Sequence, residues 1–157
     1  MNNNKVDKYI AQLSIDCVIF GFQNKELKVL VSKFKYGNNL WGLPGGYILK
    51  TESIEKAAAR ILKERTSLNN IYLEQFRVFG NENRIVKSEH RTQIRRDLKK
   101  YDAIEFNETT INWMTDRFVC IGFYALVDIN KVKPIPGELD ATIEWKKIKD
   151  LPTLTHD

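Results

Sequence analysis

The sequence predicts a mixed α/β domain, in which a pair of strands is followed by one helix and then by further strands. Two adjacent apolar, β-branched segments near the N-terminus, an amphipathic helical segment behind a glycine-rich stretch, and later strand-like segments all indicate this class. Strands and helices do not alternate regularly, which argues against a repeating βαβ array. With 157 residues, 43% of them hydrophobic, the chain has the size of one compact core, so we expect a single domain over residues 1–157.

The first elements are two strands joined as a hairpin. Residues 12–22 and 27–34 are apolar and rich in β-branched side chains, and the polar residues 23–26 link them. Residues 40–47 then combine three glycines and a proline with large apolar side chains. This composition excludes a helix there and indicates a tight backbone path beside a sheet or a ligand.

The clearest helix covers residues 54–65, after Thr51 or Ser53 as the N-cap. Helical spacing is shown by its apolar residues Ile54, Ala57, Ala58, Ile61 and Leu62. Residues 71–79, 117–127 and 144–148 have the pattern of strands, and a last helix or turn is expected near Asp150. Between them, residues 88–101 are expected to be helical, with Ile94 and Leu98 on one side.

Composition and charge set limits on the function. No apolar run approaches the roughly 18 residues that a membrane span needs, and the N-terminus is polar, so we expect a cytoplasmic protein with no membrane partner. Cys17 and Cys120 lie in strand-like runs and are interpreted as small buried apolar residues rather than a disulfide pair. The net charge of +5 is concentrated in residues 84–101, which is usual for a solvated surface but also suits contacts to phosphates on a ligand or on DNA.

The segment 46–68 resembles the Nudix box, whose pattern is G-x5-E-x7-R-E-U-x-E-E-x-G-U with U an aliphatic residue. The preceding Leu43-Pro44-Gly45 also matches the usual approach to that box. Six positions fall in register, namely Gly46, Glu52, Arg60, Leu62, Glu64 and Leu68. The resemblance implies the Nudix fold, a mixed β-sheet between helices in an α/β/α arrangement.

The departures from the box lie where its chemistry is carried out. In active members three carboxylates on one helix face bind Mg²⁺ or Mn²⁺, which neutralise a pyrophosphate and activate the attacking water. The corresponding positions here are Ile61, Glu64 and Arg65. One apolar residue, one carboxylate and one cation therefore replace the metal-binding set.

Two functions remain possible for these residues. Glu52 and Glu64 could hold one metal ion weakly, although Arg65 brings a repelling charge of roughly 4 kcal/mol at about 4 Å and an effective dielectric of 20. Alternatively, Gly45, Gly46, Arg60, Glu64 and Arg65 could form a binding site in which Arg65 contacts a ligand phosphate. Arg60 and Glu64 could also be only a helix-surface pair at i, i+4, and Glu52 only a carboxylate that favours the helix dipole.

Residues 70–80 and 145–154 are similar to one branch of the family, the Nudix-domain transcription regulators that sense ADP-ribose or arabinose. In that branch the Nudix domain is a ligand sensor and dimerisation unit, and a winged-helix DNA-binding domain follows an L-P-x-L motif, here residues 151–154. The resemblance implies a homodimer, and contact with DNA through a C-terminal domain beyond this chain. Compared with this branch, residues 85–116 form a basic insertion, which is expected to be a lid, a dimer contact, a DNA contact or a plain structural addition.

Three hypotheses follow. The first is a non-catalytic domain that senses a sugar or nucleotide sugar for a transcription regulator. The second is a Nudix hydrolase that cleaves ADP-ribose or another nucleoside diphosphate derivative with Mg²⁺, using Glu52, Arg60 and Glu64 and a further carboxylate such as Glu82 or Glu105. The third is a scaffold that binds nucleic acid through the basic insertion.

Overall fold

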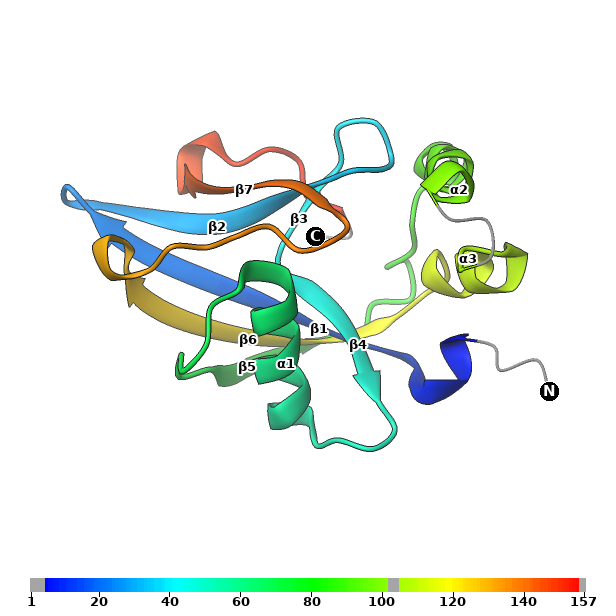
Figure 1. Cartoon of the computed structure of the whole chain (residues 1–157), viewed down its shortest axis with the longest axis horizontal. Helices are drawn as coiled ribbons and strands as arrows, with labels where there is room; N and C mark the ends of the chain where they lie inside the picture. The colour runs from blue at the N-terminus through cyan, green and yellow to red at the C-terminus, as the bar shows by residue number, and fades with distance from the viewer. Residues whose placement is uncertain (1–4, 102–104, 156–157) are drawn as a thin grey trace.

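A computed structural model describes residues 5–101 and 105–155 and shows one mixed sheet with three α-helices (Figure 1). The strands are β1 (Tyr9–Gln23), β2 (Glu26–Phe34), β3 (Trp41–Gly42), β4 (Gly45–Leu49), β5 (Glu74–Phe79), β6 (Val119–Asp128) and β7 (Asp140–Lys147). The helices are α1 (Ile54–Thr66), α2 (Ser88–Tyr101) and α3 (Glu108–Met114). Short 3-10 turns cover Lys5–Lys8, Ile129–Lys131 and Ile148–Asp150.

The long strand β1 organises the sheet. Its later part pairs antiparallel with β2 over residues 20–23, whereas its earlier part pairs antiparallel with β4 over residues 9–16. On its other edge β1 runs parallel to β6, which pairs with β5. Because β2 and β4 share one edge of β1 at different heights, a space opens between them, and the candidate site lies there.

Helices lie on both sides of β4, which confirms the expected layered α/β fold. On one face, Ile48 belongs to the main hydrophobic core with Ala57, Ala58 and Ile61 of α1. On the other face, the ring of Tyr47 lies edge to face with Trp113 of α3, with their centroids 4.4 Å apart. The expected final helix or turn near Asp150 is a 3-10 turn, so the second helical layer comes from the 85–116 segment instead.

The end of the described chain returns to the sheet at β3. Leu151 and Leu154 pack against Val29, Val31 and Trp41 on the face of β2 that points away from α1. The backbone nitrogen of Thr155 donates a hydrogen bond of 2.8 Å to the carbonyl oxygen of Trp41. This C-terminal segment covers apolar surface that would otherwise face water.

Most of the elements expected from the sequence are present, and three were missed. The helix expected at 54–65 and the strands expected at 12–22, 27–34, 71–79, 117–127 and 144–148 are confirmed with shifted ends, as is the helix at 88–101. The glycine-rich stretch 40–47 contains β3 and the start of β4, and α3 had not been predicted. Cys17 and Cys120 are buried and unbonded to each other, as expected.

The 85–116 segment builds a small core of its own at one end of the molecule, away from α1 (Figure 1). Its members are Val86, Ile94, Leu98, Phe106 and Ile111, and they enclose Leu40 from the loop before β3. The described parts of this segment, residues 85–101 and 105–116, are therefore packed against the domain. Within the described part of the chain, no helix is long and apolar enough to cross a membrane.

Candidate functional site

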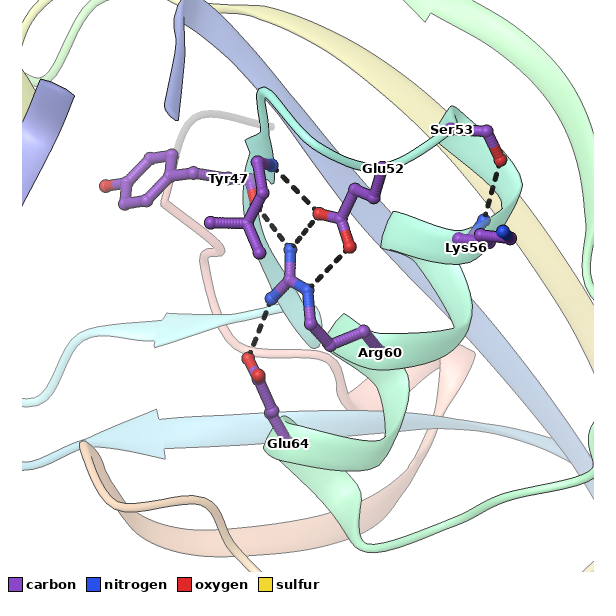
Figure 2. Close-up of polar contacts among 7 residues, drawn as sticks. Tyr47, Glu52, Ser53, Lys56, Arg60 and Glu64 are labelled. Carbon is purple, nitrogen blue, oxygen red and sulfur yellow. Dashed lines mark hydrogen bonds and ion pairs between the residues drawn. The ribbon is translucent and has the colours of Figure 1, made fainter. Parts of the chain in front are cut away.

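The first turn of α1 fixes the charged residues of the box. Ser53 caps the helix, because its Oγ accepts a hydrogen bond of 3.3 Å from the backbone nitrogen of Lys56 (Figure 2). Just before this cap, a carboxylate oxygen of Glu52 accepts a 2.8 Å bond from the backbone nitrogen of Leu49. Glu52 is thus held between the end of β4 and the start of α1.

Arg60 ties these parts together (Figure 2). Its guanidinium donates two hydrogen bonds to Glu52, of 2.9 and 2.6 Å, one of 2.9 Å to Glu64 and one of 2.8 Å to the carbonyl oxygen of Tyr47. The hydrogen bonds from Arg60 are the main reason that the pKa of Glu52 is below its usual value. The fork–fork pairing with Glu52 is the stronger of the two ion pairs, because Glu52 is 11% exposed and Glu64 is 59% exposed.

This network occupies the carboxylates on which a metal site would depend. A divalent cation of the Mg²⁺ type needs several oxygen ligands around one point, but Arg60 is bonded to both Glu52 and Glu64. Among residues 5–101 and 105–155, no group of three or more histidine, cysteine, aspartate or glutamate side chains is placed to hold a metal ion. The residues present do not fit the metal site that the box normally provides.

The first lost carboxylate position belongs to the core. Ile61 is 1% exposed and packs with the main core cluster. A Cβ added to Gly46 would lie 3.1 Å from Ile61 Cγ1, so Gly46 gives the isoleucine the room that it occupies. The glycine of the box serves helix-to-strand packing at this point.

The second lost position is taken by a buried ion pair. Arg65 donates a hydrogen bond of 2.5 Å to Asp140, whose side chain is fully buried, and its guanidinium lies 5.3 Å from the ring centroid of Phe34. Burial raises the pKa of Asp140 to about 6, although the charge of Arg65 acts in the opposite direction. The expected contact between Arg65 and a ligand phosphate remains a prediction, and it would have to compete with Asp140.

A second polar cluster lies beside Gly45. Asp16 accepts hydrogen bonds from Cys120 Sγ at 3.0 Å and from Arg84 Nη2 at 3.3 Å. A Cβ on Gly45 would approach Asp16 Oδ1 to 2.1 Å, so only glycine allows the strand to pass here. Burial is the main cause that raises the pKa of the Cys120 thiol, with Asp16 adding to it, so this cysteine stays protonated.

These features surround one cavity of about 290 Å³ in the space between β2 and β4. Of the residues expected at a ligand site, the structure brings together Gly45, Gly46, Arg60, Glu64 and Arg65 on its lining. Glu105 also lines it, whereas Glu52 lies behind Arg60 and Glu82 is exposed outside the lining. The 85–116 segment supplies a wall of the cavity, with Thr110 and Trp113 from α3.

Several lining residues were missed at the sequence level, among them Asp16, Tyr47, Arg84 and Trp113, together with the buried partner Asp140. The alternating pattern of residues 12–22 does contain a signal, since Asp16 is a charge inside an apolar strand. Asp140 offered none, because it stands in a polar stretch and its partner is 75 residues away.

Part of the basic run at residues 84–101 is bonded within the fold. Arg84 pairs with Asp16, Arg91 donates to the carbonyl oxygen of Thr115 at 2.7 Å, and Arg95 and Lys99 both pair with Glu108. These groups stabilise the segment from within. Lys87, Arg96 and Lys100 of the same run are exposed, so part of its positive charge faces solvent.

Comparison with known proteins gives the family. The model of the NUDIX domain matches residues 11–157. The chain belongs to the NUDIX domain family. This confirms the resemblance drawn from the box at residues 46–68, and the Nudix fold with it. Among curated proteins, none matches the chain.

Solved Nudix structures share this fold. The NUDIX domain of Shewanella oneidensis NrtR, crystallised with ADP ribose, superposes with a TM-score of 0.64 at 24% identity, over 98% of this chain and 86% of that one. The whole Shewanella NrtR gives 0.58 at 26% identity, over 93% of this chain but 57% of that one. A MutT/nudix family protein from Enterococcus faecalis gives 0.62 at 22% identity, over 88% and 44% of the two chains. This chain thus spans about half the length of these two whole proteins.

Proposed function

We propose that this chain is the ligand-sensing Nudix domain of a transcription regulator, and that it binds a sugar or nucleotide sugar, of arabinose or ADP-ribose type, without hydrolysing it. One observation carries the proposal: Arg60 is bonded to both remaining carboxylates of the box, Glu52 and Glu64. Without a carboxylate set for metal binding, a Nudix site loses the groups that activate water and neutralise pyrophosphate. The cavity beside it persists and can bind a ligand.

The similarity to NrtR supports the regulatory part of the proposal. The Shewanella protein has been crystallised with ADP ribose at its NUDIX domain and, as a longer chain, with a 27mer DNA. By analogy, we propose that residues 1–157 form the sensor, that the 85–116 segment is an insertion within it, and that a winged-helix domain binds DNA in the complete regulator. A homodimer and a cytoplasmic location belong to the same proposal.

A hydrolase is the second candidate, because Glu64 is 59% exposed and lines the cavity together with Glu105. These two carboxylates could hold a metal ion if Arg60 released Glu64. The fold of a bifunctional NMN adenylyltransferase/ADP ribose pyrophosphatase from Francisella tularensis is similar, with a TM-score of 0.56 at 17% identity, over 89% of this chain and 34% of that one.

The test is a calorimetric titration of ADP-ribose and of arabinose in Mg²⁺, with chromatography of the mixture for phosphomonoester products. We expect saturable heat for one of the two ligands and no products. Formation of AMP would contradict the sensor function and support the hydrolase function, provided that Glu64→Gln abolishes this product. Turnover that survives Glu64→Gln comes from a contaminant and leaves the proposal intact. If neither ligand binds and nothing is cleaved, the proposal fails.

A further inference from the structure

The 85–116 segment contributes the side of the cavity opposite the box. The cavity is bounded by α1 through Arg60 and Arg65 and by the insertion through Thr110 and Trp113. Long additions to a compact domain that line a cavity often determine what the cavity binds. The chemistry of this side therefore indicates the class of ligand.

Charge argues for a neutral ligand. Three arginines line the cavity, and each is bonded to a carboxylate: Arg60 to Glu52 and Glu64, Arg65 to Asp140, and Arg84 to Asp16. A pyrophosphate would require these pairs to open, because a buried anion needs cations or several donors around it. A ligand without charge requires no such rearrangement.

Aromatic rings form part of the wall. Trp113 stacks on Tyr9 with an interplanar angle of 16° and meets Tyr47 and Phe118 edge on, at centroid distances of 4.4 and 5.1 Å. All four residues line the cavity. Electron-rich ring faces attract the weakly positive C–H groups on one face of a sugar ring, whose hydroxyl groups then point towards polar side chains.

Thr110 supplies a buried hydroxyl group to the cavity wall. Three threonines of the structure are buried, and two of them, Thr66 and Thr115, donate to the carbonyl oxygen four residues earlier, at 2.6 and 2.8 Å. Thr110 is 4% exposed and lines the cavity, yet its Oγ1 has no hydrogen-bond partner among residues 5–101 and 105–155. In the same range, Arg65 Nε is also buried without a partner. Buried polar atoms are nearly always satisfied, and these two lie on residues that line the cavity, so each has the capacity to bond a ligand there.

The size of the cavity agrees with this class. A volume of about 290 Å³ equals roughly ten water molecules at about 30 Å³ each. This volume leaves room for a pentose or a hexose together with a few water molecules.

We propose that α3 forms a wall of the ligand site and that the Thr110 hydroxyl binds a hydroxyl group of a neutral sugar of pentose or hexose size. This inference rests on the proposed sensor function and narrows its ligand class. Thr110 is a specificity-determining residue in this arrangement, because its hydroxyl group is satisfied only by a ligand that carries a polar group at that point.

The experiment is a calorimetric titration of a panel of neutral pentoses and hexoses, with ADP-ribose and inorganic pyrophosphate as the charged probes. It uses the wild type, Thr110→Val and the matched control Thr109→Val, whose threonine is exposed on the same helix. We expect saturable binding of at least one neutral sugar, weakened roughly three- to tenfold by Thr110→Val and unchanged by Thr109→Val. Valine fills the same space, so Thr110→Val should unfold at the same or a higher urea concentration than the wild type.

The outcomes separate this inference from the proposed function. Saturable binding of ADP-ribose without any neutral sugar would overturn the ligand class and leave the sensor function standing. Equal binding of the neutral sugar by the wild type and Thr110→Val would overturn the role of Thr110. Cleavage of ADP-ribose that Glu64→Gln abolishes would overturn the sensor function itself.

Discussion

Arg60 joins three parts of the molecule that are separate in the sequence. It contacts the backbone of β4 at Tyr47, the residue Glu52 just before α1, and Glu64 one turn further along the helix. In a Nudix enzyme the neighbouring carboxylates would be shared with metal ions. Here the guanidinium of Arg60 bridges Glu52, Glu64 and the backbone of Tyr47 through hydrogen bonds, and it supplies the positive charge between the two carboxylates.

Arg60→Met should lower the free energy of unfolding by about 1–3 kcal/mol, because buried acceptors on Glu52 and Tyr47 lose their donor.

Arg60 holds the pKa of Glu52 low, so the stabilisation from this ion pair is present above about pH 4.3 and is lost as the pH falls through the lowered pKa of Glu52. The free energy of unfolding of Arg60→Met should therefore decrease less than that of the wild type as the pH falls. Urea unfolding at neutral and acid pH measures both effects, with the exposed Lys63→Met as the control. Equal losses in the two variants would mean that the network contributes nothing.

Asp140 should make the protein less stable as the pH rises from about 4 to about 6. Its pKa in the folded state is raised to about 6, mainly by burial, whereas the unfolded value is about 4. The folded state therefore binds this proton more tightly, and the advantage disappears as the pH rises through that window. In Asp140→Asn the residue no longer titrates but still accepts a hydrogen bond from Arg65. Denaturant unfolding across this pH range should show the stability of Asp140→Asn increasing relative to that of the wild type as the pH rises, and parallel curves would contradict the assignment.

At the scale of the element, α1 could be derived from the sequence almost completely. Its apolar spacing, the two N-cap candidates Thr51 and Ser53, and the box all indicated the same helix. In the structure Ser53 is the cap, and the helix ends one residue later than expected. By contrast, β3 and β4 were not predicted, because glycine and proline are poor strand formers. Their pairing with β2 and β1 comes from tertiary contacts. The helix α3 has seven residues, too few for a periodic pattern to emerge.

The backbone is strained at Ser67, at the C-terminal end of α1. Ser67 stands where the box has glycine, and it adopts the left-handed conformation with φ of 59° while its backbone nitrogen bonds to the carbonyl oxygen of Lys63. Ser67→Gly should raise the free energy of unfolding by about 0.5–1 kcal/mol, since glycine adopts this conformation without a steric penalty. Ser67→Ala is the control, because alanine keeps the strain and removes the hydroxyl group. A gain in Ser67→Ala as large as that in Ser67→Gly would show that φ is not the cause.

At the scale of the whole molecule, the insertion and the sheet are joined across the cavity. The backbone nitrogen of Gly37, in the loop before β3, donates a hydrogen bond of 2.8 Å to Asp97 on α2. Leu40 of the same loop is enclosed by the small core of the insertion. The loop that leads into the box is thereby attached to the opposite wall of the site.

Asp97→Ala should loosen this attachment. Hydrogen exchange of the amides in α2 and α3 should become roughly tenfold faster or more, since a hydrogen bond to a charged group is lost, while the amides of β1 and β6 keep their wild-type rates. Arg96→Ala, at an exposed position on the same helix, serves as the control. Uniformly faster exchange in all elements would instead indicate global destabilisation.

The candidate site shows what a sequence alone can and cannot provide. The box placed Gly46, Arg60 and Glu64 on one cavity, because a helix and its preceding strand fix their relative positions over short distances. Contacts between distant segments, such as Arg65 with Asp140 or Tyr47 with Trp113, depend on the complete packing. The apolar side of the cavity therefore emerged only from the structure.

The replacements at positions 61 and 65 also bear on how this domain evolves. Ile61→Glu would place a carboxylate at a core position that is 1% exposed, and Arg65→Glu would put a second carboxylate next to the buried Asp140. Each substitution is expected to cost stability before any metal ion is gained, so neither one alone restores the carboxylate set of the box. Both positions therefore serve the packing of this domain, and its ligand specificity is expected to vary instead in the wall supplied by α3.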